Sequence, residues 1–112
     1  MPSQSIVLLP QVSATGAFVS PSPAQGDGYY NLGDGLHTAV FTFENFVGNV
    51  HLEATLAISP AESDWFTVDN TTISAATALT GSQFVNFYGN FVWVRAKGTL
   101  TSGSISHIRY NH

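Results

Sequence analysis

The chain has 112 residues, the length of one domain, and no cysteine, which excludes disulfides, thiolate metal sites and thiol nucleophiles. Only 9% of its residues are charged while 12% are aromatic, a composition that excludes an intrinsically disordered chain. The net charge of −4, with only three basic residues, argues against a nucleic-acid-binding surface.

The N-terminal segment carries no targeting signal that we recognise. It has no basic residues before its apolar run, and that run (Ile6 to Leu9) is too short for a signal peptide or a membrane span. We therefore expect synthesis in the cytoplasm without a signal peptide, no signal-dependent export and no membrane partner.

Alternation of apolar and polar residues predicts β-strands along most of the chain, and no stretch has a convincing helical period. The predicted strands, in chain order, are Ser5 to Val12, Ala17 to Ser20, Thr38 to Phe46, Val50 to Ser59, Trp65 to Val68, Gln83 to Tyr88, Phe91 to Leu100 and Ser104 to Tyr110. About eight short strands separated by turn-forming residues are typical of a sandwich or barrel. Ser59 to Glu62 resembles a capping box and predicts one short helical turn.

Two stretches are predicted to be loops. Ser20 to Gly35 is rich in proline and glycine, and Asp69 to Ser82 is rich in Thr, Ser and Ala. Within the first loop, Tyr29 and Tyr30 are the best candidates for contact with a partner or a glycan, and we expect this segment to lie across a neighbouring subunit. The predicted organisation is thus one β-sandwich domain over 1–112, with N-terminal strands plus a Pro/Gly-rich loop or arm in 1–35 and the main sandwich in 36–112.

A short repeat relates two parts of the chain. The segment 43–50 (FENFVGNV) recurs as 84–91 (FVNFYGNF), with five matching positions at a constant offset of 41 residues. Glycine and asparagine tolerate left-handed backbone, so each Gly-Asn pair predicts a corner, either a hairpin or an arch between two sheets. The predicted corner residues are Asn45, Gly48, Asn49, Asn86, Gly89 and Asn90. The repeat predicts two pseudo-symmetric halves, and a structural role for these asparagines is favoured over a sugar-binding one.

The candidate chemical groups do not form a catalytic or metal-binding motif. His51 and Glu53 share one face of a strand, a spacing that suits a metal, but the sequence offers no third ligand. The Asp27-Gly28 and Asp34-Gly35 pairs lack the remaining ligands of a calcium loop and indicate turns instead. No nucleophile elbow, phosphate loop or dinucleotide fingerprint occurs. We therefore expect a protein that is not an enzyme and that uses no metal or cofactor.

Aromatic residues are the remaining candidates for function. Trp93 lies between valines on a predicted strand and is expected to be buried. Trp65, like Tyr29 and Tyr30, is a candidate for contact with a partner or a glycan.

Three segments together resemble a known class of protein. They are Asn49 to Leu56, Pro60 to Phe66, and Gly89 to Ala96 (GNFVWVRA), within a similarity that spans about Phe41 to Lys97. In pattern they are similar to small β-sandwich modules in virion proteins of tailed phages, especially T4-like phages of marine cyanobacteria. The resemblance implies a virion structural component and assigns no functional residues.

These observations predict an all-β protein, a β-sandwich of jelly-roll type. The expected function is that of a structural protein of a phage particle, either a capsid decoration protein or a small tail or baseplate component. It would act as a homo-oligomer, such as a trimer, and contact other virion proteins. The alternative is a carbohydrate-binding or receptor-binding module, with a glycan as its partner.

Overall fold

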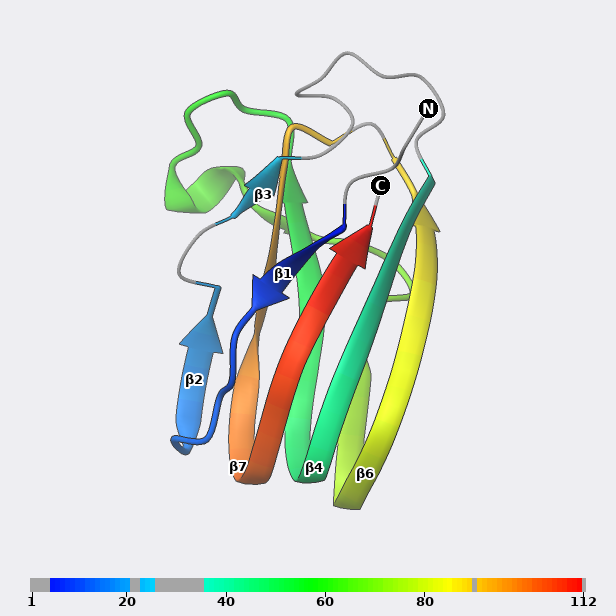
Figure 1. The fold of residues 1–112 in the computed structure, drawn as a ribbon. Coiled ribbons are helices and arrows are strands. Elements are labelled where there is room, and N and C mark those ends of the chain that lie inside the picture. The colour runs from blue at the N-terminus through cyan, green and yellow to red at the C-terminus, as the bar shows by residue number, and fades with distance from the viewer. Residues whose placement is uncertain (1–4, 21–22, 26–35, 90, 112) are drawn as a thin grey trace.

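The computed structural model describes residues 5–20, 23–25, 36–89 and 91–111, and these residues form an antiparallel β-sandwich (Figure 1). The elements are β1 (Ser5–Leu9), β2 (Gly16–Val19), β3 (Ala24–Gln25), β4 (Leu36–Thr55), the 3-10 turn η1 (Glu62–Asp64), β5 (Phe66–Thr67), β6 (Ile73–Tyr88) and β7 (Trp93–Asn111). No α-helix occurs in these ranges. The predicted all-β sandwich is confirmed, and the architecture is consistent with a jelly roll.

Three long strands build both layers of the sandwich. In Figure 1, β4, β6 and β7 each run along one layer, bend at one end of the molecule, and return in the other layer. β4 is the central strand, because it pairs with β6 on one side and with β7 on the other. The pairing shifts register between residues 43 and 48 of β4, where the strand bends.

The bends use backbone conformations that few residues adopt. Positive φ angles occur at Asn45 (51°), Gly48 (146°), Gly81 (120°) and Gly103 (74°), all within the long strands. At Gly48 the backbone also approaches β7 so closely that a Cβ would overlap the carbonyl oxygen of Thr99. The predicted corner at Gly48-Asn49 is thus an arch inside one continuous strand, and not a hairpin.

The shorter strands complete the two layers. β1 pairs with the C-terminal part of β7, whereas β2 and β3 pair with its N-terminal part. β5 pairs with the end of β4. The strands before residue 36 are therefore integrated into the sandwich through β7.

The core lies between the layers and is rich in phenylalanine. Phe41, Phe43 and Phe46 are buried on the inner side of β4, and the rings of Phe43 and Phe46 stack with centroids 4.7 Å apart. Val50, Leu52 and other apolar residues of the same strand continue this core past the bend, as the alternating pattern predicted.

Some strand boundaries differ from the prediction. The predicted strands Thr38 to Phe46 and Val50 to Ser59 form the single strand β4, which ends at Thr55, so that Leu56 is 65% exposed. The predicted short turn forms at η1, where the Asp64 carboxylate accepts a hydrogen bond from the Ala61 N–H at 2.8 Å. The prediction of a loop over Asp69 to Ser82 is wrong, because residues 73–82 belong to β6.

Candidate functional site

A cleft of about 350 Å³ opens at one end of the sandwich, between the end of β6 and the segment that follows β5. Its lining combines aromatic rings with amide, hydroxyl and carboxylate groups. The residues are Phe66, Thr67, Val68, Asp69, Asn70, Asn86, Phe87, Tyr88 and Phe91. Because the two walls come from different layers, the cleft exists only when the sandwich is assembled.

A buried aromatic cluster forms the floor of this cleft. The His37 ring stacks on Phe87 with centroids 4.9 Å apart, and Phe91 and Tyr110 complete the cluster. His37 is fully buried, and its Nε2–H donates to the carbonyl oxygen of Gly89 at 2.5 Å. In the neutral ring, Nδ1 then accepts from the Tyr110 hydroxyl at 2.6 Å. The histidine thus ties the end of β6 to β4 and β7.

The opposite wall is a turn held by one threonine. The Thr71 hydroxyl donates to the carbonyl oxygen of Val68 at 2.7 Å and accepts from the Leu52 N–H at 3.1 Å. Asn70 has a φ of 64°, a left-handed conformation that asparagine tolerates better than most residues. This turn leaves Asp69 and Asn70 exposed at the cleft.

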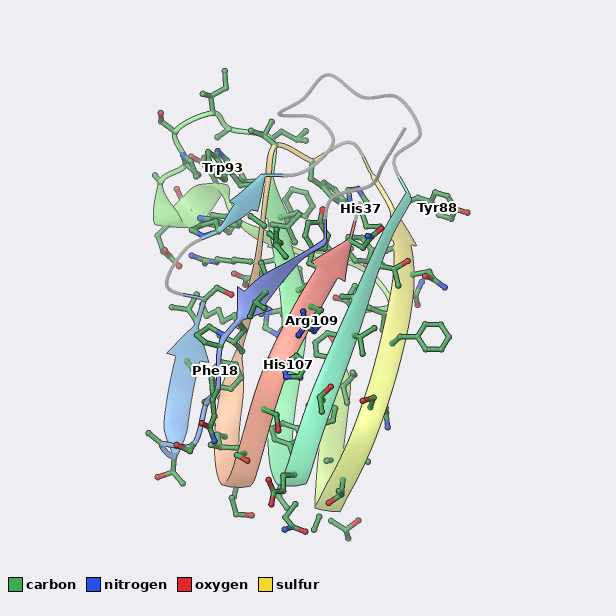
Figure 2. All side chains as sticks on the ribbon, in the orientation of Figure 1. Phe18, His37, Tyr88, Trp93, His107 and Arg109 are labelled. Carbon is green, nitrogen blue, oxygen red and sulfur yellow. The ribbon has the colours of Figure 1, made fainter. Side chains whose placement is uncertain are left out.

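Asn86 lies on β6 with its side chain oriented by a neighbour. Its Oδ1 accepts a hydrogen bond from the Thr38 hydroxyl of β4 at 2.6 Å. The Nδ2 group has no partner in the described part of the chain. Thr38 follows the buried His37 and Asn86 precedes the buried Phe87, so this hydrogen bond lies on the outer face of the sheet, away from the floor of the cleft. Figure 2 shows Tyr88 projecting outward at the end of the same strand, with His37 inside the sandwich.

A charged network lies outside the cleft, around Arg95 of β7. The guanidinium donates to the Glu53 carboxylate at 2.8 Å and to the Glu62 carboxylate at 2.7 Å, and it lies 4.2 Å from the centroid of the Trp65 ring. His51 donates to the second oxygen of Glu53 at 3.2 Å. The pair that the sequence suggested as metal ligands therefore belongs to an ion-pair network with an arginine.

The pKa values of the network reflect these contacts. Burial raises the pKa of Glu53, but hydrogen bonds from Arg95 and His51, together with the charges of Arg95 and Lys97, outweigh it, and the pKa lies below its usual value. The hydrogen bond with Arg95 lowers the pKa of Glu62. Burial lowers the pKa of Arg95, but the hydrogen bonds and charges of the Glu62 and Glu53 carboxylates outweigh this effect, and the pKa is raised.

The edge of the sandwich beside the cleft is formed by β6. This strand of 16 residues pairs with β4 and with no other strand in the described ranges. Its outward side chains include Phe84, which is 67% exposed, and Tyr88, which is 75% exposed. The sequence from residue 70 to residue 94 contains no charged residue at all.

The structure distributes the residues singled out from the sequence over several places. Asn45, Gly48 and Asn49 lie in or next to the segment of β4 where its pairing with β6 and β7 shifts register. Gly89 follows β6 with a φ of 159°, and Asn86 lines the cleft. Tyr29, Tyr30 and Asn90 lie outside the described residues.

The two copies of the repeat have different surroundings. Phe43 is buried at 2% exposure in the middle of β4, whereas its counterpart Phe84 is 67% exposed on the edge strand. Gly48 lies inside a strand and Gly89 lies after one. Corresponding residues therefore have different structural roles, and the pseudo-symmetry of the two halves stays a prediction.

The two tryptophans are partly buried. Trp93, expected to be buried, is of intermediate exposure, and its Nε1–H donates to the carbonyl oxygen of Ile58 at 2.9 Å. Trp65 lies against Arg95 and does not line the cleft. It is therefore not a free platform for a sugar ring on the side that the guanidinium covers.

Sequence patterns do not identify the cleft. They indicate Asn86 as a corner residue only, and they do not single out Phe66, Asp69 or Asn70. The left-handed Asn70, in the sequence Asp-Asn-Thr, was the one local signal of a turn that could have found them.

Among the residues that the structure describes, no group of three or more His, Cys, Asp or Glu side chains is placed to hold a metal ion. None of the helical segments described has the length and apolar character needed to cross a membrane.

No family model matches the sequence, and no curated protein is similar to it. Among solved structures, the SPBc2 prophage-derived protein YomS has a TM-score of 0.53 at 10% identity, over 98% of this chain and 91% of that chain. A carbohydrate-binding module (CBM6cm-2) from Cellvibrio mixtus lichenase 5A has a TM-score of 0.46 at 15% identity, over 98% and 86% of the chains. The module CBM29_1 from Piromyces equi has 0.45 at 10% identity, over 98% and 91%. The similarity to YomS supports the fold.

Proposed function

We propose that this protein is a non-enzymatic structural component of a phage particle that acts by self-association through the free edge of β6. The observation that carries the proposal is the chemistry of that edge. A long exposed edge strand is a template for pairing with another chain, and monomeric proteins usually protect such an edge with charges, prolines or short strands. The edge formed by residues 73–88 has no charge and no proline.

A second copy is the natural partner of this edge. Two antiparallel β6 strands related by a two-fold axis would continue the sheet from one subunit into the next. The eight residues from Gly81 to Tyr88 pair with Phe43 to Leu36 without a register shift, so the free edge is regular over this length. Phe84 would be covered in such a pair.

The virion setting is supported by the sequence. The resemblance of residues 41–97 to virion modules of tailed phages points to a particle component, and the low charge suits a protein packed against copies of itself. The expected partners are other copies of this chain and other virion proteins.

The test is the mass of the full-length protein in solution. Analytical ultracentrifugation over a wide concentration range should show a reversible oligomer, and Phe84→Lys should shift it to the monomer, because a lysine on an edge strand opposes pairing. Thr101→Lys is the matched control, since it adds the same charge at an exposed position of β7 away from this edge. It should associate like the parent.

A parent protein that stays monomeric at all concentrations would refute the proposal. So would a Phe84→Lys variant that associates as strongly as the parent. Mass spectrometry of purified phage particles tests the setting, because a virion component must appear among their proteins.

A further inference from the structure

We propose that the cleft between β6 and the turn after β5 binds a neutral saccharide. The cleft adjoins the edge of β6, but the side chains that would contact the ligand come from the opposite wall, so this inference does not rest on self-association. They are Phe66, Asp69 and Asn70.

Phe66 supplies the apolar contact. Its side chain is 43% exposed at the cleft, and its ring is held edge-on against the buried Phe91 with centroids 5.8 Å apart. An aromatic ring fixed in this way offers apolar surface without a large loss of side-chain entropy on binding. The apolar face of a sugar ring is a suitable partner for such a surface.

Two polar side chains of the turn after β5 lie beside this apolar contact. The side chains of Asp69 and Asn70 have no hydrogen-bond partner in the described part of the chain, and Thr71 holds their turn in place. Amide donors and carboxylate acceptors that converge on one cleft match the alternating donors and acceptors of sugar hydroxyls.

The charge of the lining decides between ligand classes. Asp69 is its one charged residue, so an anionic ligand such as a phosphate or an acidic peptide would be repelled. The cations Arg95 and Lys97 line a separate cavity beside Phe18. A purely apolar ligand would leave Asp69 and Asn70 without partners, which costs free energy. A neutral hydroxylated ligand satisfies all of these groups.

The rigidity of the floor supports binding by a preformed site. The cleft rests on the buried cluster of His37, Phe87 and Phe91, and His37 is bonded to both Gly89 and Tyr110. A preformed cleft does not have to be ordered when the ligand binds, and this lowers the entropic cost of binding.

The experiment uses the full chain, labelled with ¹⁵N, and three soluble probes: cellohexaose, maltohexaose and chitohexaose. A glycan array extends the search to other neutral sugars. We expect at least one saccharide to bind and to shift the amide resonances of Asp69 and Asn70. Phe66→Ala and Asp69→Ala should each weaken this binding by about tenfold or more.

Leu56→Ala is the control, because Leu56 is an exposed apolar residue outside the cleft. It should bind the saccharide like the parent. Both cleft variants alter exposed side chains, so they should keep the parent's dispersed spectrum. Three results would overturn the proposal: no neutral saccharide bound by the array or by the probes, shifts confined to other parts of the protein, or equal binding by Phe66→Ala and the parent.

Discussion

At the scale of single residues, Arg95 shows how one side chain changes the interpretation of its neighbours. His51 and Glu53 do share a strand face and are in contact, as their spacing predicted. Arg95 lies 42 residues away in sequence and pairs with Glu53 across β4 and β7. No local sequence pattern identifies Arg95 as the partner of Glu53. The sequence could therefore suggest a metal-binding pair but not the ion pair that forms.

The lowered pKa of Glu53 predicts a pH dependence of stability. Because the pKa of Glu53 in the folded state lies below its ordinary value of about 4.5, the ionised carboxylate stabilises the fold above about pH 4.5, and this contribution is lost as the pH falls through the folded pKa. Glu53→Gln should lower the free energy of unfolding at neutral pH by about 1–3 kcal/mol. Its thermal midpoint should also fall less steeply than the parent's below pH 4.5.

Thermal unfolding followed by circular dichroism at a series of pH values measures both effects. Glu44→Gln is the control, because Glu44 is exposed and lies outside the Arg95 network. It should show the parent's dependence on pH. Superimposable curves for Glu53→Gln and the parent would show that the Glu53–Arg95 pair contributes nothing to acid stability.

At the scale of elements, the bends of the long strands determine the sandwich. Sequence patterns located the glycine of the β4 bend, because a Gly-Asn pair interrupts two alternating runs. They could not show that both runs belong to one strand, since continuity through an arch depends on pairing with β6 and β7.

The close approach at Gly48 gives a prediction for this bend. Gly48→Ala should cost about 3 kcal/mol, because an added Cβ is strained by the positive φ and also overlaps the Thr99 carbonyl. Gly81→Ala is matched to it. Gly81 has a φ of 120° but open space around its Cβ position, so only the strain of about 1 kcal/mol remains.

Urea denaturation of the parent and the two variants gives these free energies. Equal costs at Gly48 and Gly81 would mean that backbone strain alone, and not the contact with β7, makes glycine necessary in the β4 bend.

The missed part of β6 has a related physical cause. Period-2 alternation appears when one face of a strand is buried, and residues 74–84 are exposed apart from Ala75 and Leu79. An edge strand with little burial is held mainly by backbone hydrogen bonds to its neighbour, which leave no trace in the pattern of side chains. Thr, Ser and Ala in such a strand resemble a polar loop.

At the scale of the whole molecule, the free edge and the cleft lie on the same side of the sandwich. Sequence patterns predicted the fold class, but the cleft joins residues of β6 to a turn in the other layer, in the connection between β5 and β6. Only the folding of β4 over itself brings these walls together. For that reason the cleft could not be predicted from spacing along the chain.

The two proposals together predict multivalent binding. If copies associate through β6, each particle presents several clefts, and a surface dense in the bound sugar engages them at once. The apparent affinity for an immobilised polysaccharide should then exceed that for the soluble hexasaccharide by about 10²-fold or more. Phe84→Lys should lose most of this gain while the affinity for the hexasaccharide, which occupies one cleft, stays near the parent's. Surface plasmon resonance on sparse and dense polysaccharide surfaces, with titration calorimetry for the hexasaccharide, separates the two quantities. If the parent and Phe84→Lys bind the dense surface equally, the edge does not bring clefts together, whatever each single cleft binds.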